Sequence, residues 1–243
     1  MIKNIAHHTL HILGLPVLWV ALGLALKLLG ADTGPQSRFA GLDWVLYAGL
    51  IAGMMAQARG WAGLCMKPMP AAMVFIALSV VCGMVYEASL TVDGTGMGGM
   101  HADTRTSFVL AVGDYLMLAV LCWYATRALH LDFRGLFFLS AGISLTEGMV
   151  FTGVIWMVLT SGQPLQLPLY LGYYFLAYAA FLAMPLVLLN AKSLWRKSAP
   201  VARFGPATLL ALGFVLGMVS RIIWGLFYGP AVTQIFDLQP AVD

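Results

Sequence analysis

The chain has 243 residues, of which 61% are hydrophobic and only 9% are charged, with a mean hydropathy of +0.88. Soluble domains carry about 25% charged residues, so this composition excludes a soluble globular protein and indicates an integral membrane protein. The net charge of +3 is small and dispersed along the chain, which argues against a nucleic-acid partner. The three cysteines form no CxxC pair, so they predict neither a disulfide framework nor a zinc site.

Seven apolar stretches are long enough to cross a bilayer, whose hydrocarbon core of about 30 Å requires about 20 residues of helix. They cover residues 9–29, 43–62, 70–90, 107–128, 135–160, 167–190 and 206–229. The segments between them are rich in glycine, proline and charged residues, and none is long enough to form a separate domain. The sequence therefore predicts an all-α fold in which residues 1–243 form a single bundle of seven transmembrane helices.

The lysine and arginine residues indicate how the bundle is oriented. If the N-terminus lies inside, nine of them fall in inner segments: Lys3, Arg59, Lys67, Arg127, Arg134, Lys192, Arg196, Lys197 and Arg203. The three that fall in outer segments are Lys27, Arg38 and Arg105. Because positive residues collect on the cytoplasmic side, we expect the N-terminus inside, the C-terminus outside and a bacterial inner (cytoplasmic) membrane as the location. We expect the first helix to be retained, although Lys3 and the apolar run after it also fit a signal peptide.

The predicted spans contain the ionisable residues Glu87, Asp114, Glu147 and Arg221. Each costs roughly 2.5–3.5 kcal/mol at the centre of a membrane helix, so such residues usually pair, line water or carry out chemistry. At a rise of about 1.5 Å per residue, Asp114 and Arg221 lie roughly 12 Å from the outer ends of their spans, and Glu147 lies near the middle of its span. We therefore predict a polar cluster in the outer half of the bundle, with protons shared among its carboxyl groups and Arg221 holding one of them ionised.

Polar and aromatic side chains recur at helical spacing beside these charges. On the fifth predicted span, Ser140 and Ser144 share a face with Glu147. The residues that we predict to bind a substrate are aromatic and lie on the last two spans: Tyr174, Tyr178 and Trp224. The alternative is that Arg221 and one acid form a structural salt bridge, with Glu87 reaching outward to the membrane surface.

Two histidine-containing segments have the residue types of a metal site. His7 and His11 lie one helical turn apart at the start of the chain, and Met97, Met100 and His101 lie in a glycine-rich loop. A hydrated helix start and a flexible loop explain these residues equally well. We therefore assign no metal and no cofactor. The last span has Arg221 as its only basic residue and no lysine for a retinal Schiff base, which argues against a rhodopsin.

Two stretches resemble the integral-membrane terpene cyclases of meroterpenoid pathways. They are GLDWVLYAGLIAGMM at 41–55 and MVYEASL at 84–90, in which Glu87 matches an acidic residue that follows an aromatic one on an early helix of that family. The resemblance implies a small seven-helix enzyme and covers about a quarter of the chain. The chain departs from that family in having an extra helix before this region and no acidic residue in its last helix, so we do not assign it to the family.

Three functions are compatible with this pattern of residues. The first is a membrane-embedded enzyme that acts on a lipid-soluble substrate, with isoprenoids as one candidate class. Glu147 or Glu87 would donate a proton, Asp114 would act as base or hold water, and Arg221 would set the protonation states. The second is a proton- or ion-coupled transporter or channel that uses the same acids. The third is a non-catalytic membrane subunit or assembly factor. We expect the enzyme, with membrane lipids and a hydrophobic small molecule as partners; a homo-oligomer or a membrane-complex partner remains open.

Overall fold

The computed structural model describes residues 71–92, 104–131, 133–151, 153–160, 167–183, 185–186 and 205–228. This part of the chain is all-helical, as the composition predicts. Within it, three helical segments are long and apolar enough to cross a membrane: Ala71–Ala88, Phe108–Ala128 and Pro206–Phe227. The predicted spans 9–29 and 43–62 lie outside the described residues.

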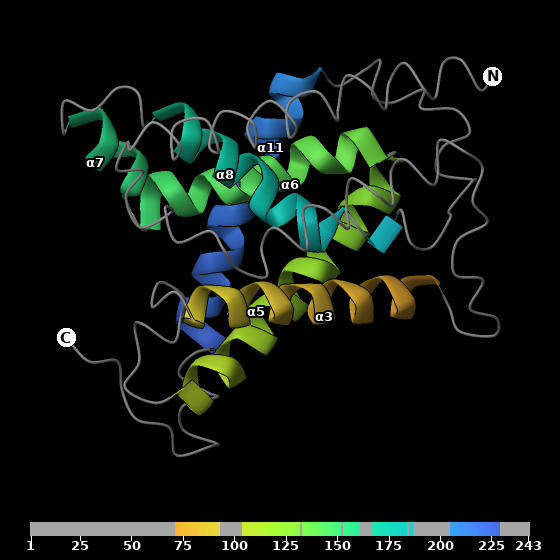
Figure 1. Ribbon diagram of the computed structural model, residues 1–243. Coiled ribbons are helices and arrows are strands. Elements are labelled where there is room, and N and C mark those ends of the chain that lie inside the picture. The colour runs from red at the N-terminus through yellow and green to blue at the C-terminus, as the bar shows by residue number, and fades with distance from the viewer. Residues whose placement is uncertain are drawn as a thin grey trace, which may run out of the picture.

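The described helices form layers that cross one another (Figure 1). In chain order they are α3 (Ala71–Val92), α5 (Thr104–Ala128), α6 (Phe133–Thr146), η2 (Glu147–Phe151), α7 (Val154–Thr160), α8 (Leu167–Leu182), α11 (Pro206–Ile223) and η4 (Trp224–Tyr228). Helix α6 packs against both α8 and α11, and α3 packs against both α5 and α8. In Figure 1 the blue helix α11 crosses behind α6 at a steep angle.

An aromatic cluster joins α3, α5 and α8 in the core. The ring of Phe181, which is fully buried, lies 4.9 Å from that of Tyr115 and 4.7 Å from that of Tyr178, measured between centroids. Its centroid also lies 6.0 Å from that of Tyr86 on α3. Edge and tilted contacts of this kind stabilise aromatic cores beyond the burial of their area. They also fix the positions of Tyr115 and Tyr178, whose hydroxyl groups make the polar contacts described below.

The stretch 135–160, predicted as one continuous helix, is interrupted in the structure. Helix α6 ends at Thr146, a π-helical turn η2 follows from Glu147, and α7 begins only at Val154. Between them, Gly153 has a φ of +63°, which glycine adopts without a Cβ clash. A side chain on Gly148 would lie 2.6 Å from the ring of Tyr174, so α8 packs directly against the backbone of η2. Glu147 therefore begins the π-helical turn and does not lie inside a regular α-helix.

Helix α6, which ends directly before Glu147, and helix α11, which carries Arg221, pack with their backbones in contact. A Cβ on Gly213 would collide with the carbonyl oxygen of Leu139, and a Cβ on Gly142 would lie 3.0 Å from the Cα of Gly213. A Cβ on Gly217 would lie 2.6 Å from Oγ1 of Thr146. Gly213 and Gly217 have the GxxxG spacing that lets membrane helices approach closely. At these positions, space rather than the backbone dihedral angle requires glycine.

A hydrogen bond between the two helices adds to this contact. Oγ1 of Thr146 donates to the carbonyl oxygen of Phe214 at 2.9 Å and also lies 3.2 Å from the carbonyl oxygen of Gly142 on its own helix. Glu147 is the next residue after Thr146, and Arg221 lies one turn beyond Gly217. The close approach of the two helices therefore brings Glu147 and Arg221 to the same level.

Candidate functional site

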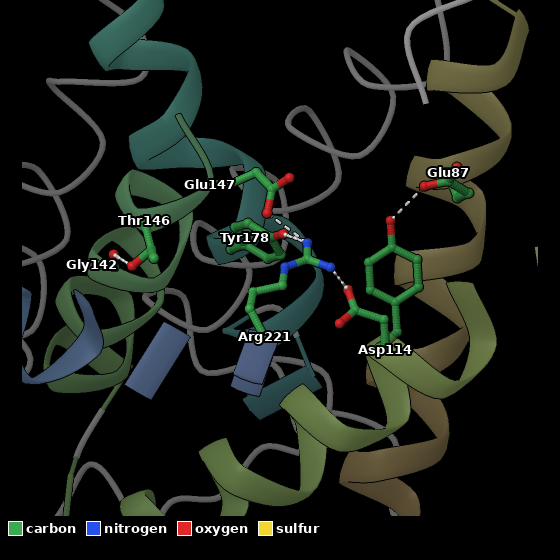
Figure 2. A network of polar contacts seen from close by, with 8 residues as sticks. Glu87, Asp114, Gly142, Thr146, Glu147, Tyr178 and Arg221 are labelled. Atoms are coloured by element: carbon green, nitrogen blue, oxygen red, sulfur yellow. Dashed lines mark hydrogen bonds and ion pairs between the residues drawn. The ribbon is translucent and has the colours of Figure 1, made fainter. Parts of the chain in front are cut away.

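Arg221 reaches from α11 to three other helical segments (Figure 2). Its Nη2 donates to Oε2 of Glu147 at the start of η2 at 2.6 Å, and to the hydroxyl oxygen of Tyr178 on α8 at 3.3 Å. Its Nη1 lies 3.2 Å from Oδ2 of Asp114 on α5. We call Arg221, Asp114, Glu147 and Tyr178 the arginine cluster. A single guanidinium therefore links α5, η2 and α8 to α11.

The two carboxyl groups of the arginine cluster differ in their surroundings. The Asp114 side chain is fully buried, whereas Glu147 keeps 26% of its side chain exposed and Arg221 keeps 15%. Neither oxygen of Asp114 makes a hydrogen bond within the described part of the chain, so its contact with Arg221 is an ion pair without hydrogen-bond alignment. Because one positive charge faces two carboxyl groups, the three charged groups together are neutral when the two acids hold one proton between them.

Glu87 forms a second polar contact on α3. Its side chain is only 2% exposed, and its Oε2 accepts a hydrogen bond of 3.0 Å from the hydroxyl of Tyr115. The alternative reading in which Glu87 reaches outward to the membrane surface is therefore wrong. A Cβ on Gly83, one turn before Glu87, would lie 2.6 Å from the Tyr115 ring, so this glycine makes room for the ring. Since Asp114 and Tyr115 are adjacent, α5 presents a carboxyl to Arg221 and a phenol to Glu87.

Replacement of Tyr115 by phenylalanine is expected to lower the free energy of unfolding by about 1–3 kcal/mol. The buried carboxyl of Glu87 would lose a hydrogen bond, whereas the ring contact with Phe181 would remain. Unfolding of the detergent-solubilised protein would measure the loss. Tyr124→Phe is the control, because Tyr124 lies on the same helix and is 68% exposed. Equal stability of the two variants would contradict the role given to the hydroxyl.

The structure places the predicted site residues in two groups. Asp114, Glu147 and Arg221 meet directly, and Tyr178 joins them through its hydroxyl. Glu87 pairs with Tyr115 on the neighbouring helix, and Figure 2 shows it apart from the guanidinium of Arg221. The predicted substrate-binding residues Tyr174 and Trp224 lie beside the backbone of η2 and at the start of η4. The catalytic and substrate-binding roles of all these residues stay predictions.

Reasoning from the sequence missed the residues that hold the site in place. Tyr115 carried a usable signal, because it directly follows a buried aspartate. The GFVLG sequence at 213–217 was also visible as a helix-packing motif. No signal in the sequence indicated that its partner would be the segment from Gly142 to Thr146, about 70 residues earlier, since only the fold brings those helices together.

No metal-binding group occurs in the part of the chain that the structure describes. Nowhere within it do three or more His, Cys, Asp or Glu side chains lie close enough to hold a metal ion. The candidate metal residues His7, His11, Met97, Met100 and His101 lie outside the described residues.

Comparison with known proteins gives no relative: no family model, no curated protein and no solved structure matches the chain. The chain is therefore not assigned to a family, and its function is argued from its own residues.

Proposed function

We propose that the protein is a membrane-embedded enzyme that carries out acid–base chemistry on a lipid-soluble substrate at the arginine cluster. The observation that supports this is the contact of one guanidinium with two carboxyl groups, of which Asp114 is fully buried and Glu147 is partly exposed. With one proton shared by the pair, a proton can leave or return while Arg221 stabilises the carboxylate that remains. In this proposal the partly exposed Glu147 gives a proton to the substrate and the carboxyl pair of Glu147 and Asp114 takes one back, so the reaction is an isomerisation or rearrangement with no net proton change.

Exposed apolar side chains lie on η2, which begins with Glu147, and on α7, which packs against η2. Val150 and Phe151 on η2 are each 46% exposed, and the Phe151 ring centroid lies 5.8 Å from the guanidinium carbon of Arg221. On α7, Trp156 is 54% exposed. A hydrophobic molecule dissolved in the bilayer could approach Glu147 from this side without a water-filled path. This supports a lipid-soluble substrate, for which isoprenoids are one candidate class.

The test is the transfer of solvent deuterium to a lipid. We expect the purified protein in nanodiscs, incubated in D₂O with isoprenoids or a membrane lipid extract, to produce deuterated molecules that mass spectrometry detects. Glu147→Gln should lower the rate by at least about 100-fold, because it removes the group that exchanges the proton. Tyr124→Phe, an exposed change on α5, should leave the rate unchanged. Undiminished deuterium transfer in Glu147→Gln would refute the assignment.

The helix interruption favours a proton-coupled transporter as the second candidate. Irregular backbone at membrane depth occurs where it is buried in protein or lines a cavity, and transporters bind substrates at such interrupted helices. The sequence suggested no broken helix, yet the backbone is π-helical from Glu147 to Phe151, and a new helix begins at Val154 after Gly153 with its positive φ. Proton flux into proteoliposomes that Glu147→Gln abolishes, without deuterated products, would favour transport. If neither activity is found and Glu147→Gln changes only stability, the third possibility, a structural subunit, would be favoured.

We also infer that the whole chain forms seven spans in a bacterial inner membrane, with the N-terminus inside and the C-terminus outside. The support is the distribution of lysine and arginine, nine in the inner segments against three in the outer ones. Single cysteines introduced at Lys3 and at Asp243 should react with a membrane-impermeant reagent only from the inside and only from the outside, respectively. Labelling of both positions from one side would overturn this topology.

A further inference from the structure

The face of the continuous α11–η4 run that carries Arg221 also carries two buried hydrogen-bond donors that have no acceptor among the described residues. Ser220 is 1% exposed, and neither its Oγ nor Nε1 of Trp224, which is shielded from solvent, makes a hydrogen bond within the described residues. Ser220, Trp224 and Arg221 lie within an arc of roughly 100° around the helix axis. On α6, Ser144 lies on the same face as Glu147, and its buried hydroxyl also makes no hydrogen bond within the described residues.

Two hydroxyl groups on neighbouring segments, those of Ser140 on α6 and Thr160 on α7, bond to a carbonyl oxygen of their own helix. Oγ of Ser140 donates to the carbonyl oxygen of Leu136 at 2.7 Å, and Oγ1 of Thr160 lies 2.9 Å from that of Trp156. This back-bonding is the usual solution for a hydroxyl in an apolar helix. The hydroxyl of Ser220 does not use it. An indole N–H has no alternative of this kind, because it is a donor only and needs an acceptor from elsewhere.

The position of these donors explains why the fold leaves them without acceptors. Gly213 and Gly217 form the stripe of α11 that touches α6, and Ser220 and Trp224 continue that stripe at helical spacing. At their level α6 has already ended at Thr146 and given way to the π-helical turn η2. Ser220 and Trp224 therefore lie on the part of the stripe near η2, where Glu147 and Arg221 meet, and not against a regular helix surface.

We propose that Ser220 and Trp224 bind an oxygen atom of the substrate, and that the substrate is a neutral lipid-soluble molecule with a carbonyl or hydroxyl oxygen. This inference rests on the proposed function, because it places the oxygen beside the proton-exchanging Glu147. The two donors require an acceptor. An anionic head such as a phosphate is disfavoured, since Arg221 already faces two carboxyl groups and a further negative charge would have no counter-charge. A pure hydrocarbon would leave both donors unsatisfied.

Binding of four molecules that share one chain and differ in their heads tests the proposal: farnesene, farnesol, farnesylacetone and farnesyl phosphate. The full-length protein in nanodiscs is titrated with each, and the dissociation constant is taken from the concentration dependence of the unfolding temperature. We expect farnesol or farnesylacetone to bind at least about tenfold more tightly than farnesene and farnesyl phosphate. Trp224→Phe and Ser220→Ala should each weaken that binding about fivefold, the effect of one neutral hydrogen bond.

Two variants serve as matched controls. Ser79→Ala removes an equally buried hydroxyl without a described partner on α3, and Trp156→Phe removes an exposed indole N–H on α7. Neither should change the dissociation constants. If Trp224→Phe fails to fold, the ¹⁵N–¹H resonance of the Trp224 indole in the unchanged protein replaces it and should shift on addition of the ligand that binds most tightly.

The possible outcomes separate this inference from the proposed function. Three outcomes would overturn the oxygen subsite, that is, the binding of a substrate oxygen by Ser220 and Trp224. They are tightest binding of farnesyl phosphate, binding of farnesene as tight as that of farnesol and farnesylacetone, and equal effects of the Ser220 and Ser79 variants. If the subsite fails while Glu147→Gln still abolishes deuterium transfer, the enzyme proposal stands without it. If Trp224→Phe weakens binding and Glu147→Gln leaves deuterium transfer intact, the subsite stands and the enzyme proposal fails.

Discussion

Replacement of Arg221 by methionine is expected to lower the free energy of unfolding by about 3–5 kcal/mol, the usual cost of removing one partner from a buried ion pair. Asp114 is fully buried and Glu147 is partly exposed, and both would lose their counter-charge. Methionine keeps the apolar stem of the side chain, so the loss would report the charge rather than the packing. Denaturant unfolding of the detergent-solubilised protein would measure it.

Two further variants show whether uncompensated charge causes the loss. Adding Asp114→Asn and Glu147→Gln to Arg221→Met should restore most of the stability, because a neutral buried group does not need a counter-charge. Arg127→Met is the control, since Arg127 is an exposed arginine at the end of α5 that lies over the Trp123 ring at 5.8 Å; it should cost less than about 1 kcal/mol. A triple variant no more stable than Arg221→Met would show that the arginine acts through packing instead.

Replacement of Gly213 by alanine is expected to destabilise the protein by about 1–3 kcal/mol, although alanine is the better helix former. The added Cβ would collide with the carbonyl oxygen of Leu139, which belongs to the backbone of α6 and cannot move without moving that helix. The displacement would extend to the Arg221–Glu147 contact two turns further along α11. We therefore expect Gly213→Ala to lose deuterium transfer as well as stability.

Gly225→Ala is the matched control for this change. A Cβ on Gly225, in η4, would meet no atom within 4 Å, so the substitution adds helix propensity without a collision. It should leave stability unchanged or raise it by up to about 1 kcal/mol. The two substitutions are chemically identical and lie on the same helical run. The expected difference in the sign of the stability change therefore reports the contact between α6 and α11. Equal effects would mean that α6 and α11 do not pack closely in the membrane.

Prediction of the helices succeeded where the signal is local. The apolar runs at 70–90 and 206–229 correspond to the described segments α3 and α11 with η4, because length and hydropathy suffice to identify a membrane helix. The prediction failed inside 135–160. Hydropathy does not register a π-helical turn or a glycine with positive φ, so the interruption between Glu147 and Gly153 could not be read from it.

The candidate site was predictable as a set of residues but not as an arrangement. The cost of burying charge in a membrane was enough to single out Asp114, Glu147 and Arg221. It could not show that one arginine would contact both acids, or that Glu87 would instead accept a hydrogen bond from Tyr115. These facts depend on which helix faces lie against each other.

The sequence by itself determined that this is a helical membrane protein with a costly group of buried charges. Hydropathy and the free-energy cost of placing a charge in hydrocarbon depend only on the residues of each segment. Only the tertiary structure decided which charges meet. Glycines at 142, 213 and 217 bring α6 and α11 into backbone contact, and Gly83 admits the ring of Tyr115. Contacts between residues 28 or 74 positions apart are set by how helices pack, and packing depends on the shapes of facing surfaces that no single segment contains.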